Sequence, residues 1–94
     1  MNLRDQARDR GCMVRLLGIC NHNSATTVLA HIRLSGVSGM GIKADDLLGA
    51  WACSACHDAV DRRFRTDLDR DYVRLAHLEG MVRTIAQLRK EGLI

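Results

Sequence analysis

The stretch that decides the fold is residues 53–61, Cys53-Ser54-Ala55-Cys56-His57-Asp58-Ala59-Val60-Asp61. It begins with two cysteines separated by two residues, and this spacing lets both sulfur atoms reach one metal ion. The residues that follow predict a helix from about Ser54 to Arg63. His57 and Asp61 stand four residues apart on that helix, so their side chains leave the same face. The stretch therefore predicts a metal-binding knuckle that runs into a short helix.

The remaining cysteines are Cys12 and Cys20. A chain of 94 residues is expected to form one domain with a modest core, and such domains are usually stabilised by disulfides or a metal ion. Residues 1–10 are charged and hold no apolar signal-peptide core, so we expect a cytoplasmic protein with reduced thiols. We therefore predict one structural zinc ion held by Cys12, Cys20, Cys53 and Cys56. The alternatives are idle thiols, a disulfide pair, and His22 or His57 as a substitute ligand.

His31 lies between the two cysteine pairs, in the apolar and β-branched segment 25–34 that predicts a strand. A lone histidine on an apolar strand is more often a core residue with hydrogen-bonded ring nitrogens. Arg33 would share its face of the strand. A histidine beside an arginine also suits a phosphate, because one accepts a proton and the other holds the oxygens. His57 and Asp61 are similarly ambiguous: their spacing alone favours an ordinary surface pair over a shared divalent cation.

The rest of the chain predicts two further helices and several turns. Residues 2–10 predict a short amphipathic helix, residues 11–22 an irregular segment, and Asp45 or Asp46 the cap of a short helical turn that ends near Ala50. Residues 35–42 are rich in glycine but lack the context of a phosphate-binding fingerprint, so we expect no nucleotide cofactor. No segment approaches a membrane span, so we expect no membrane partner.

The longest helical signal covers residues 69–91, and Gly92 is expected to end the helix. Its apolar residues are spaced by three and four. They could pack on their own domain or against a second copy, so a monomer and a homodimer both stay open. We expect packing on the domain itself, because a chain this small needs that apolar surface for its core. The stripe consists of Leu75, Leu78, Val82, Ile85 and Leu88.

The charge is mildly basic. The formal net charge is +3, and 12 of the 14 basic residues are arginine. Arginine presents a planar fork that suits phosphate or carboxylate oxygens, so the bias fits a nucleic-acid partner. A genome rich in G and C gives the same bias, and composition alone favours neither explanation.

Stretches along nearly the whole chain carry a family resemblance: residues 10–15, 18–21, 29–34, 41–43, 52–58, 78–81 and 90–92. The order of a cysteine pair, a strand with a histidine, a glycine-containing loop and a C-x2-C-H helix resembles the HNH, or ββα-metal, endonuclease motif. More closely, the chain is similar to the YbcO-like family of small phage and prophage nucleases. This resemblance implies an α+β fold, with a zinc-stapled ββα-metal core at about residues 11–63 and a long C-terminal helix.

The resemblance also implies roles for individual residues. His31 falls where the motif has its general base, and His57 and Asp61 fall where it binds a catalytic cation (Mg²⁺, Mn²⁺ or Zn²⁺). Asp46 is the nearest match to the motif's central asparagine. Ala30 replaces the acid or second histidine that usually precedes the base. The candidate contacts to nucleic acid are Arg33, Lys43 and Arg62.

The function implied is a metal-dependent endonuclease that hydrolyses phosphodiester bonds of DNA, in phage DNA processing or recombination inside the host cell. The alternative is a non-catalytic zinc-stapled module that binds nucleic acid or a protein, and Ala30 favours it. A thiol redox protein built on Cys53 and Cys56 is a third hypothesis. The helix start would lower a thiol pKa, but no thioredoxin-like βαβ pattern surrounds the pair.

Overall fold

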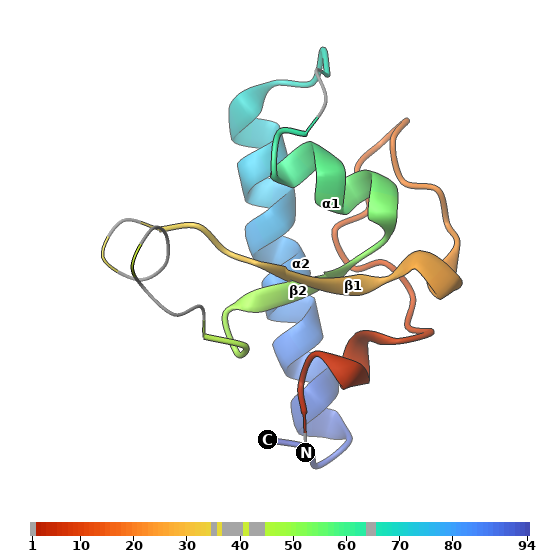
Figure 1. Ribbon diagram of the computed structural model, residues 1–94, viewed down its shortest axis with the longest axis vertical. Coiled ribbons are helices and arrows are strands. Elements are labelled where there is room, and N and C mark those ends of the chain that lie inside the picture. The colour runs from red at the N-terminus through yellow and green to blue at the C-terminus, as the bar shows by residue number, and fades with distance from the viewer. Residues whose placement is uncertain (1, 35, 37–40, 42–44, 64–65) are drawn as a thin grey trace.

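The computed structural model of the chain describes residues 2–34, 36, 41, 45–63 and 66–94. Within these residues the fold is α+β, with a two-stranded sheet and two α-helices (Figure 1). The elements in chain order are the 3-10 helices η1 (Asp5–Ala7) and η2 (Ser24–Thr26), strands β1 (Val28–His31) and β2 (Gly49–Ala52), and helices α1 (Ser54–Val60) and α2 (Arg70–Lys90).

The two strands pair antiparallel, with Val28 opposite Ala52 and His31 opposite Gly49. The amide of Ile32 donates to the carbonyl of Leu48 at 2.7 Å and continues the ladder past β1. Gly49 allows the close approach, because a Cβ there would lie 2.9 Å from Cδ1 of Leu29. The sheet therefore depends on a small residue at the point where His31 leaves the strand.

Both strands differ from the sequence-based expectation. The predicted strand 25–34 is shortened to β1, because the side chain of Asn23 accepts from the amide of Ala25 and starts η2 there. The predicted helical turn from Asp45 to Ala50 is wrong. Asp45 does cap a turn, since its side chain accepts from the amide of Leu47 at 2.9 Å. The chain then enters β2, whose four residues are all buried.

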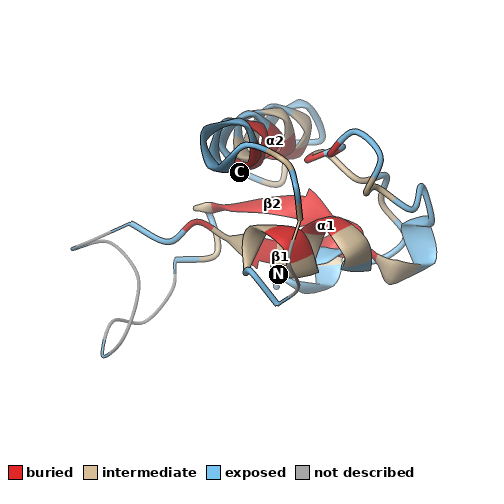
Figure 2. Cartoon of the chain, turned by 90° about the horizontal axis from the view of Figure 1, so that it is seen from above, coloured by how far each residue is buried: buried red, intermediate tan, exposed pale blue. Residues whose placement is uncertain are grey.

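Helix α2 crosses the direction of the strands (Figure 1) and packs against β2, with β1 on the far side of β2 (Figure 2). The amide of Trp51 donates to the Thr84 hydroxyl at 3.0 Å, and that hydroxyl donates to the Gly80 carbonyl at 2.8 Å. The Trp51 carbonyl accepts from the amide of Met13 at 2.7 Å. The polar groups of a buried strand edge need such partners. Thr84 is therefore buried on α2 because its hydroxyl satisfies the Trp51 amide at the edge of the sheet.

The prediction that the apolar stripe of α2 packs on the domain is wrong for most of its residues. Leu75, Leu78 and Val82 are 55%, 39% and 61% exposed, and only Leu88 of the stripe is buried. The buried face is instead made mostly of small residues: Val73, Ala76, His77, Gly80, Thr84 and Leu88. The helix backbone approaches residues 13–14 closely at Gly80, where a larger side chain would hold it away, whereas Leu88 packs with Ala7 and Trp51.

The ends of α2 agree better with the sequence. The Asp69 side chain accepts from the amide of Asp71, and Gly92 adopts a left-handed φ of +74°. The amides of Gly92 and Leu93 donate to the carbonyls of Arg89 and Leu88, each at 3.0 Å, which is a Schellman ending. None of the described helices is long and apolar enough to cross a membrane.

The N-terminal segment is held against the end of α2. The predicted helix 2–10 is reduced to the three residues of η1. The Arg10 guanidinium lies 4.5 Å from the centroid of the Trp51 ring and forms two hydrogen bonds with the Glu91 carboxylate. Its hydrogen bond lowers the pKa of Glu91 to about 2.

The packing at Gly80 makes a test of this fold. Alanine in an exposed helix is favoured over glycine by about 1 kcal/mol. At Gly80 a Cβ would meet the Met13 carbonyl oxygen and Val14 Cγ2 at 3.0 Å. We therefore expect Gly80→Ala to destabilise the protein by about 1–3 kcal/mol, measured by thermal denaturation. Gly11→Ala is the matched control, because no atom lies within 4 Å of its Cβ position. An equal or higher melting temperature for Gly80→Ala would contradict this packing.

Candidate functional site

The four cysteines gather at one point. The Sγ atoms of Cys12, Cys20, Cys53 and Cys56 all lie within 4.8 Å of one another, and none of these residues forms a disulfide. The sulfurs of Cys53 and Cys20 are 3.9 Å apart. Four sulfurs at Zn–S distances of about 2.3 Å in a tetrahedron are separated by about 3.8 Å. The donor set and its spacing therefore fit one metal ion.

Backbone amides surround the sulfurs of this cluster. The amide of Arg15 donates to the sulfur of Cys12, that of Cys56 to Cys53 and that of Leu16 to Cys56, each at 3.4 Å. Arg15 takes a left-handed φ of 55°, which closes the turn after Cys12. Residues 12–15 thus repeat the turn of the Cys53–Cys56 pair. Cys12 alone supplies the sulfur of this turn, and Cys20 reaches the cluster from farther along the chain. The long spacing between Cys12 and Cys20 is therefore compatible with one site.

The thiols of the cluster affect one another strongly. Hydrogen bonds from the Cys56 thiol and from backbone amides lower the pKa of Cys12, and the same contact raises the pKa of Cys56. Burial raises the pKa of Cys20. The cluster therefore stabilises one thiolate but disfavours ionisation of the other thiols. A bound divalent cation would remove this penalty by offsetting the negative charge of the thiolates.

The substitute ligands considered from the sequence lie outside this cluster. Nδ1 of His22 is 3.7 Å from the sulfur of Cys20, on an exposed residue. His57 pairs with Asp61 through Nε2 and Oδ2 at 3.0 Å. The cluster is thus made by cysteines alone within the part of the chain that the structure describes.

His31 stands at the end of β1 and pairs with Asp46, which follows in the loop before β2. Its Nε2 lies 2.7 Å from Oδ1 of Asp46, and Arg4 Nε lies 3.2 Å from the same oxygen. The hydrogen bond to His31 lowers the pKa of Asp46, so this carboxyl is ionised at neutral pH. A carboxylate only accepts hydrogen bonds, so Nε2 carries a proton, and in the neutral imidazole Nδ1 is the nitrogen with a free lone pair.

Asp61 is the centre of a second group. Its side chain is only 9% exposed and meets His57 as the i, i+4 spacing predicted. Arg33 Nε lies 3.5 Å from Oδ1, and a guanidinium nitrogen of Arg63 lies 3.6 Å from Oδ2. Arg33 was expected beside His31. Because β1 ends at His31, Arg33 reaches Asp61 instead.

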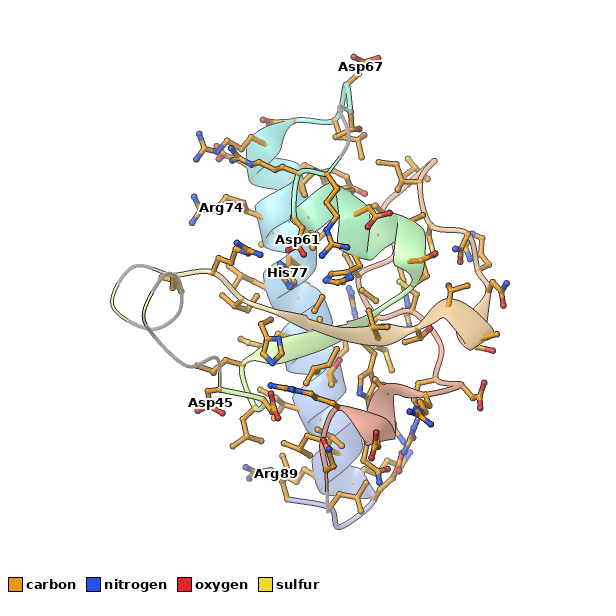
Figure 3. All side chains as sticks on the ribbon, in the orientation of Figure 1. Asp45, Asp61, Asp67, Arg74, His77 and Arg89 are labelled. Carbon is orange, nitrogen blue, oxygen red and sulfur yellow. The ribbon has the colours of Figure 1, made fainter. Side chains whose placement is uncertain are left out.

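His77 on α2 belongs to this region and was missed by the sequence analysis. Its Nε2 lies 2.9 Å from the carbonyl oxygen of Ala30. Burial lowers the pKa of His77, the charge of Asp61 opposes this, and the charges of His57 and His31 add to the lowering. His31, His57 and Asp61 therefore all lie within electrostatic range of His77. Figure 3 shows Asp61 and His77 adjacent in its view. The sequence held one indication of its position: His77 is at helical spacing from Val73 and Gly80, which lie on the same buried face of α2.

The remaining predicted residues fall on or beyond the edge of this region. Arg62 is exposed, has a left-handed φ of 59°, and lines a cavity of about 340 Å³ together with Arg33, Asp61 and His77. Lys43 lies outside the described residues. Within the described chain, the cysteines are the one group of three or more metal-ligating side chains that converge. His57 and Asp61 therefore offer two ligands without a third.

Comparison with known proteins assigns the chain to a family. The sequence matches the family model described as "Putative nuclease YbcO" over residues 1–93. The chain belongs to the YbcO family. It is 52% identical over 93 residues to the proteins of that name from Escherichia coli (strain K12) and Enterobacteria phage 82, covering 99% of this chain and 96% of each relative.

A solved structure is also similar. It is described as "a putative bacteriophage protein from Escherichia coli str. K-12 substr. MG1655", is 47% identical and has a TM-score of 0.83, with 97% of this chain and 100% of that chain covered. The family resemblance seen in the sequence motifs is thus confirmed. The HNH assignment stays a prediction.

The cysteine cluster predicts a definite metal stoichiometry. We expect the purified protein to hold one divalent metal ion per chain, measured by plasma mass spectrometry. Cys53→Ser should lose it and melt at a lower temperature, because metal binding contributes folding free energy. His22→Ala removes a side chain next to Cys20 and should keep the ion. Metal retention in Cys53→Ser, or loss in His22→Ala, would contradict the four-cysteine assignment.

Proposed function

We propose that this chain is a metal-dependent endonuclease that hydrolyses phosphodiester bonds of DNA, built on an HNH-like ββα-metal core. The observation that carries the proposal is the presence of two histidine–carboxylate pairs, His31–Asp46 at the end of β1 and His57–Asp61 at the end of α1. Both histidines affect the pKa of His77. The names of the relatives as nucleases support the same reaction.

His31 is the general base in this proposal. Its Nδ1 takes a proton from the water that attacks the phosphorus. Asp46, 2.7 Å from Nε2, holds the imidazole in one orientation and stabilises the imidazolium that forms. Asp46 is also the nearest match to the central asparagine of the motif that the sequence resembles.

His57 and Asp61 are the residues that would hold the catalytic cation (Mg²⁺, Mn²⁺ or Zn²⁺). Their nitrogen and oxygen lie 3.0 Å apart on one helix face, which fits a cation that takes its other ligands from water and phosphate oxygens. When bound, such a cation supplies positive charge to the scissile phosphate. Arg33 and Arg63 hold the Asp61 carboxylate from the other side.

The four cysteines have a structural role, and we propose zinc as their metal, since four thiolates are a common zinc donor set in a reducing compartment. The ion would tie residues 12–20 to the start of α1, which carries His57. We place the enzyme in phage or prophage DNA processing inside the bacterial host, in keeping with the phage origin of one relative.

A second candidate is a non-catalytic zinc-stapled module that binds nucleic acid or a protein. It is favoured by Ala30, which is fully buried and offers no ligand where the motif usually has one. On this alternative, His31 and His57 serve only to hold their carboxylate partners.

A plasmid-nicking assay separates the two candidates. With Mg²⁺ or Mn²⁺ added to metal-loaded protein, we expect nicking by the parent and a loss of about 10²–10⁴-fold in His31→Ala, because the general base is removed. His22→Ala is the matched control on an exposed histidine and should nick normally. Equal nicking by His31→Ala would indicate a contaminant. No nicking by any form of the protein on several DNAs would favour the binding module.

A further inference from the structure

Two adjoining cavities lie where the end of α1 meets the start of α2. The larger, of about 560 Å³, is lined by residues between Ala59 and Arg74. The smaller, of about 340 Å³, reaches from there to Arg33, Asp61 and His77. Val60, Arg62, Arg70 and Arg74 line both, so the two cavities adjoin at these side chains and are together called the groove.

Among the described residues, the groove is lined by five arginines and one acidic residue, Asp61. The side chains of Arg62, Arg70 and Arg74 form no ion pair or hydrogen bond among the described residues. No acidic residue of the described chain lines the larger cavity. Arg63, which also lines it, is the exception and pairs with Asp58 and Asp61. Like charges held this close repel one another, so the groove favours an anion with several oxygens.

The floor of the larger cavity is apolar. It is formed by Ala59, Val60, Leu68 and Val73, and Ala59 and Val73 belong to the buried core. Phosphate contacts to a regular duplex need cationic side chains but no apolar hollow beside them. A cavity of this size, with apolar walls and a few charged groups, suits one small ring system. The ligand is therefore part apolar and part phosphate.

We propose that this groove binds an unpaired nucleotide of the DNA substrate, with the base on Val60, Leu68 and Val73 and the flanking phosphates on Arg62, Arg70 and Arg74. Guanidinium groups suit both parts, because they bind phosphate oxygens in pairs and stack on bases. The inference rests on the proposed nuclease function for its role.

The groove leads to the proposed active site. Its smaller part is lined by Asp61, the proposed cation ligand, and by His77. A strand held in the larger cavity thus continues toward the His57–Asp61 group. The preferred substrate is DNA with a single-stranded segment next to the cut, rather than an uninterrupted duplex.

The test is fluorescence anisotropy without added Mg²⁺ or Mn²⁺, so that binding is read apart from cleavage. The probes are one labelled single strand, its duplex, and the same strand with abasic sites in place of its bases. Stacking contributes about 1–3 kcal/mol per base, so the normal strand should bind about tenfold more tightly than the abasic strand. It should also bind more tightly than the duplex.

The matched variants change equal charge at two places. Arg70→Ala/Arg74→Ala removes two arginines of the groove, and Arg8→Ala/Arg89→Ala removes two exposed arginines elsewhere. Figure 3 shows Arg74 and Arg89 near opposite ends of α2. The groove variant should lose at least tenfold in affinity for the single strand. The slope of log K against log salt concentration should become less negative by about 1.4, because two phosphate contacts are lost. The control variant should keep the affinity and the slope of the parent protein.

Three results would overturn the inference: equal binding of the normal and abasic strands, a preference for duplex, or equal losses in the two variants. Cleavage plays no part in this readout. A protein that never nicks DNA but shows the expected order of affinities supports the groove and contradicts the nuclease proposal. A protein that nicks DNA but does not show that order of affinities supports the nuclease proposal and contradicts the groove.

Discussion

The cluster of four sulfur atoms is the constraint on which the rest of the structure depends. It connects an irregular N-terminal segment to the first turn of α1, and the core beside it is made largely of alanine: Ala30, Ala50, Ala52, Ala59 and Ala76. Such small side chains bury little apolar area, so hydrophobic burial alone contributes modestly. In addition, four thiols within 4.8 Å of one another cannot all ionise without strong repulsion between their negative charges. A bound cation turns this electrostatic cost into a cross-link, which is how a chain this small can hold a thin core.

The same small side chains explain the unexpected face of α2. The helix covers an edge of β2 whose amide and carbonyl need partners, and Thr84 and Met13 provide them. Close approach of the two backbones selects Gly80 and Ala76 on the inner face. Leu75 and Leu78 then fall on the outer face. Hydrophobic periodicity finds the helix, but hydrogen bonding of the strand edge decides which face is buried.

Features set by neighbours in the chain could be predicted from the sequence. The His57–Asp61 pair, the bounds of α2 and the left-handed Gly92 all follow from contacts over a few residues. Contacts made over longer distances could not. β2 reads as Gly-Ala-Trp-Ala and carries no strand pattern, because it is buried on every side. His77 is related to Ala30 only through the fold, and the phase of α2 had been assigned to the leucines.

The region around Asp61 shows why the proposed active site and the groove belong together. Each of its two carboxylates holds a histidine: Asp46 orients His31, and Asp61 holds His57. Asp61 also pairs with Arg33 and Arg63, whereas no ion pair within the described residues joins either carboxylate to Arg62, Arg70 or Arg74. The result is a gradient of charge, from paired groups at the reacting centre to unpaired cations at Arg70 and Arg74. Under the proposed function, a phosphate chain would be attracted most strongly at the unpaired end and would extend toward the histidines. Binding and chemistry would then be separated in space, so that the arginines attract the strand without displacing the partners of His31 and His57.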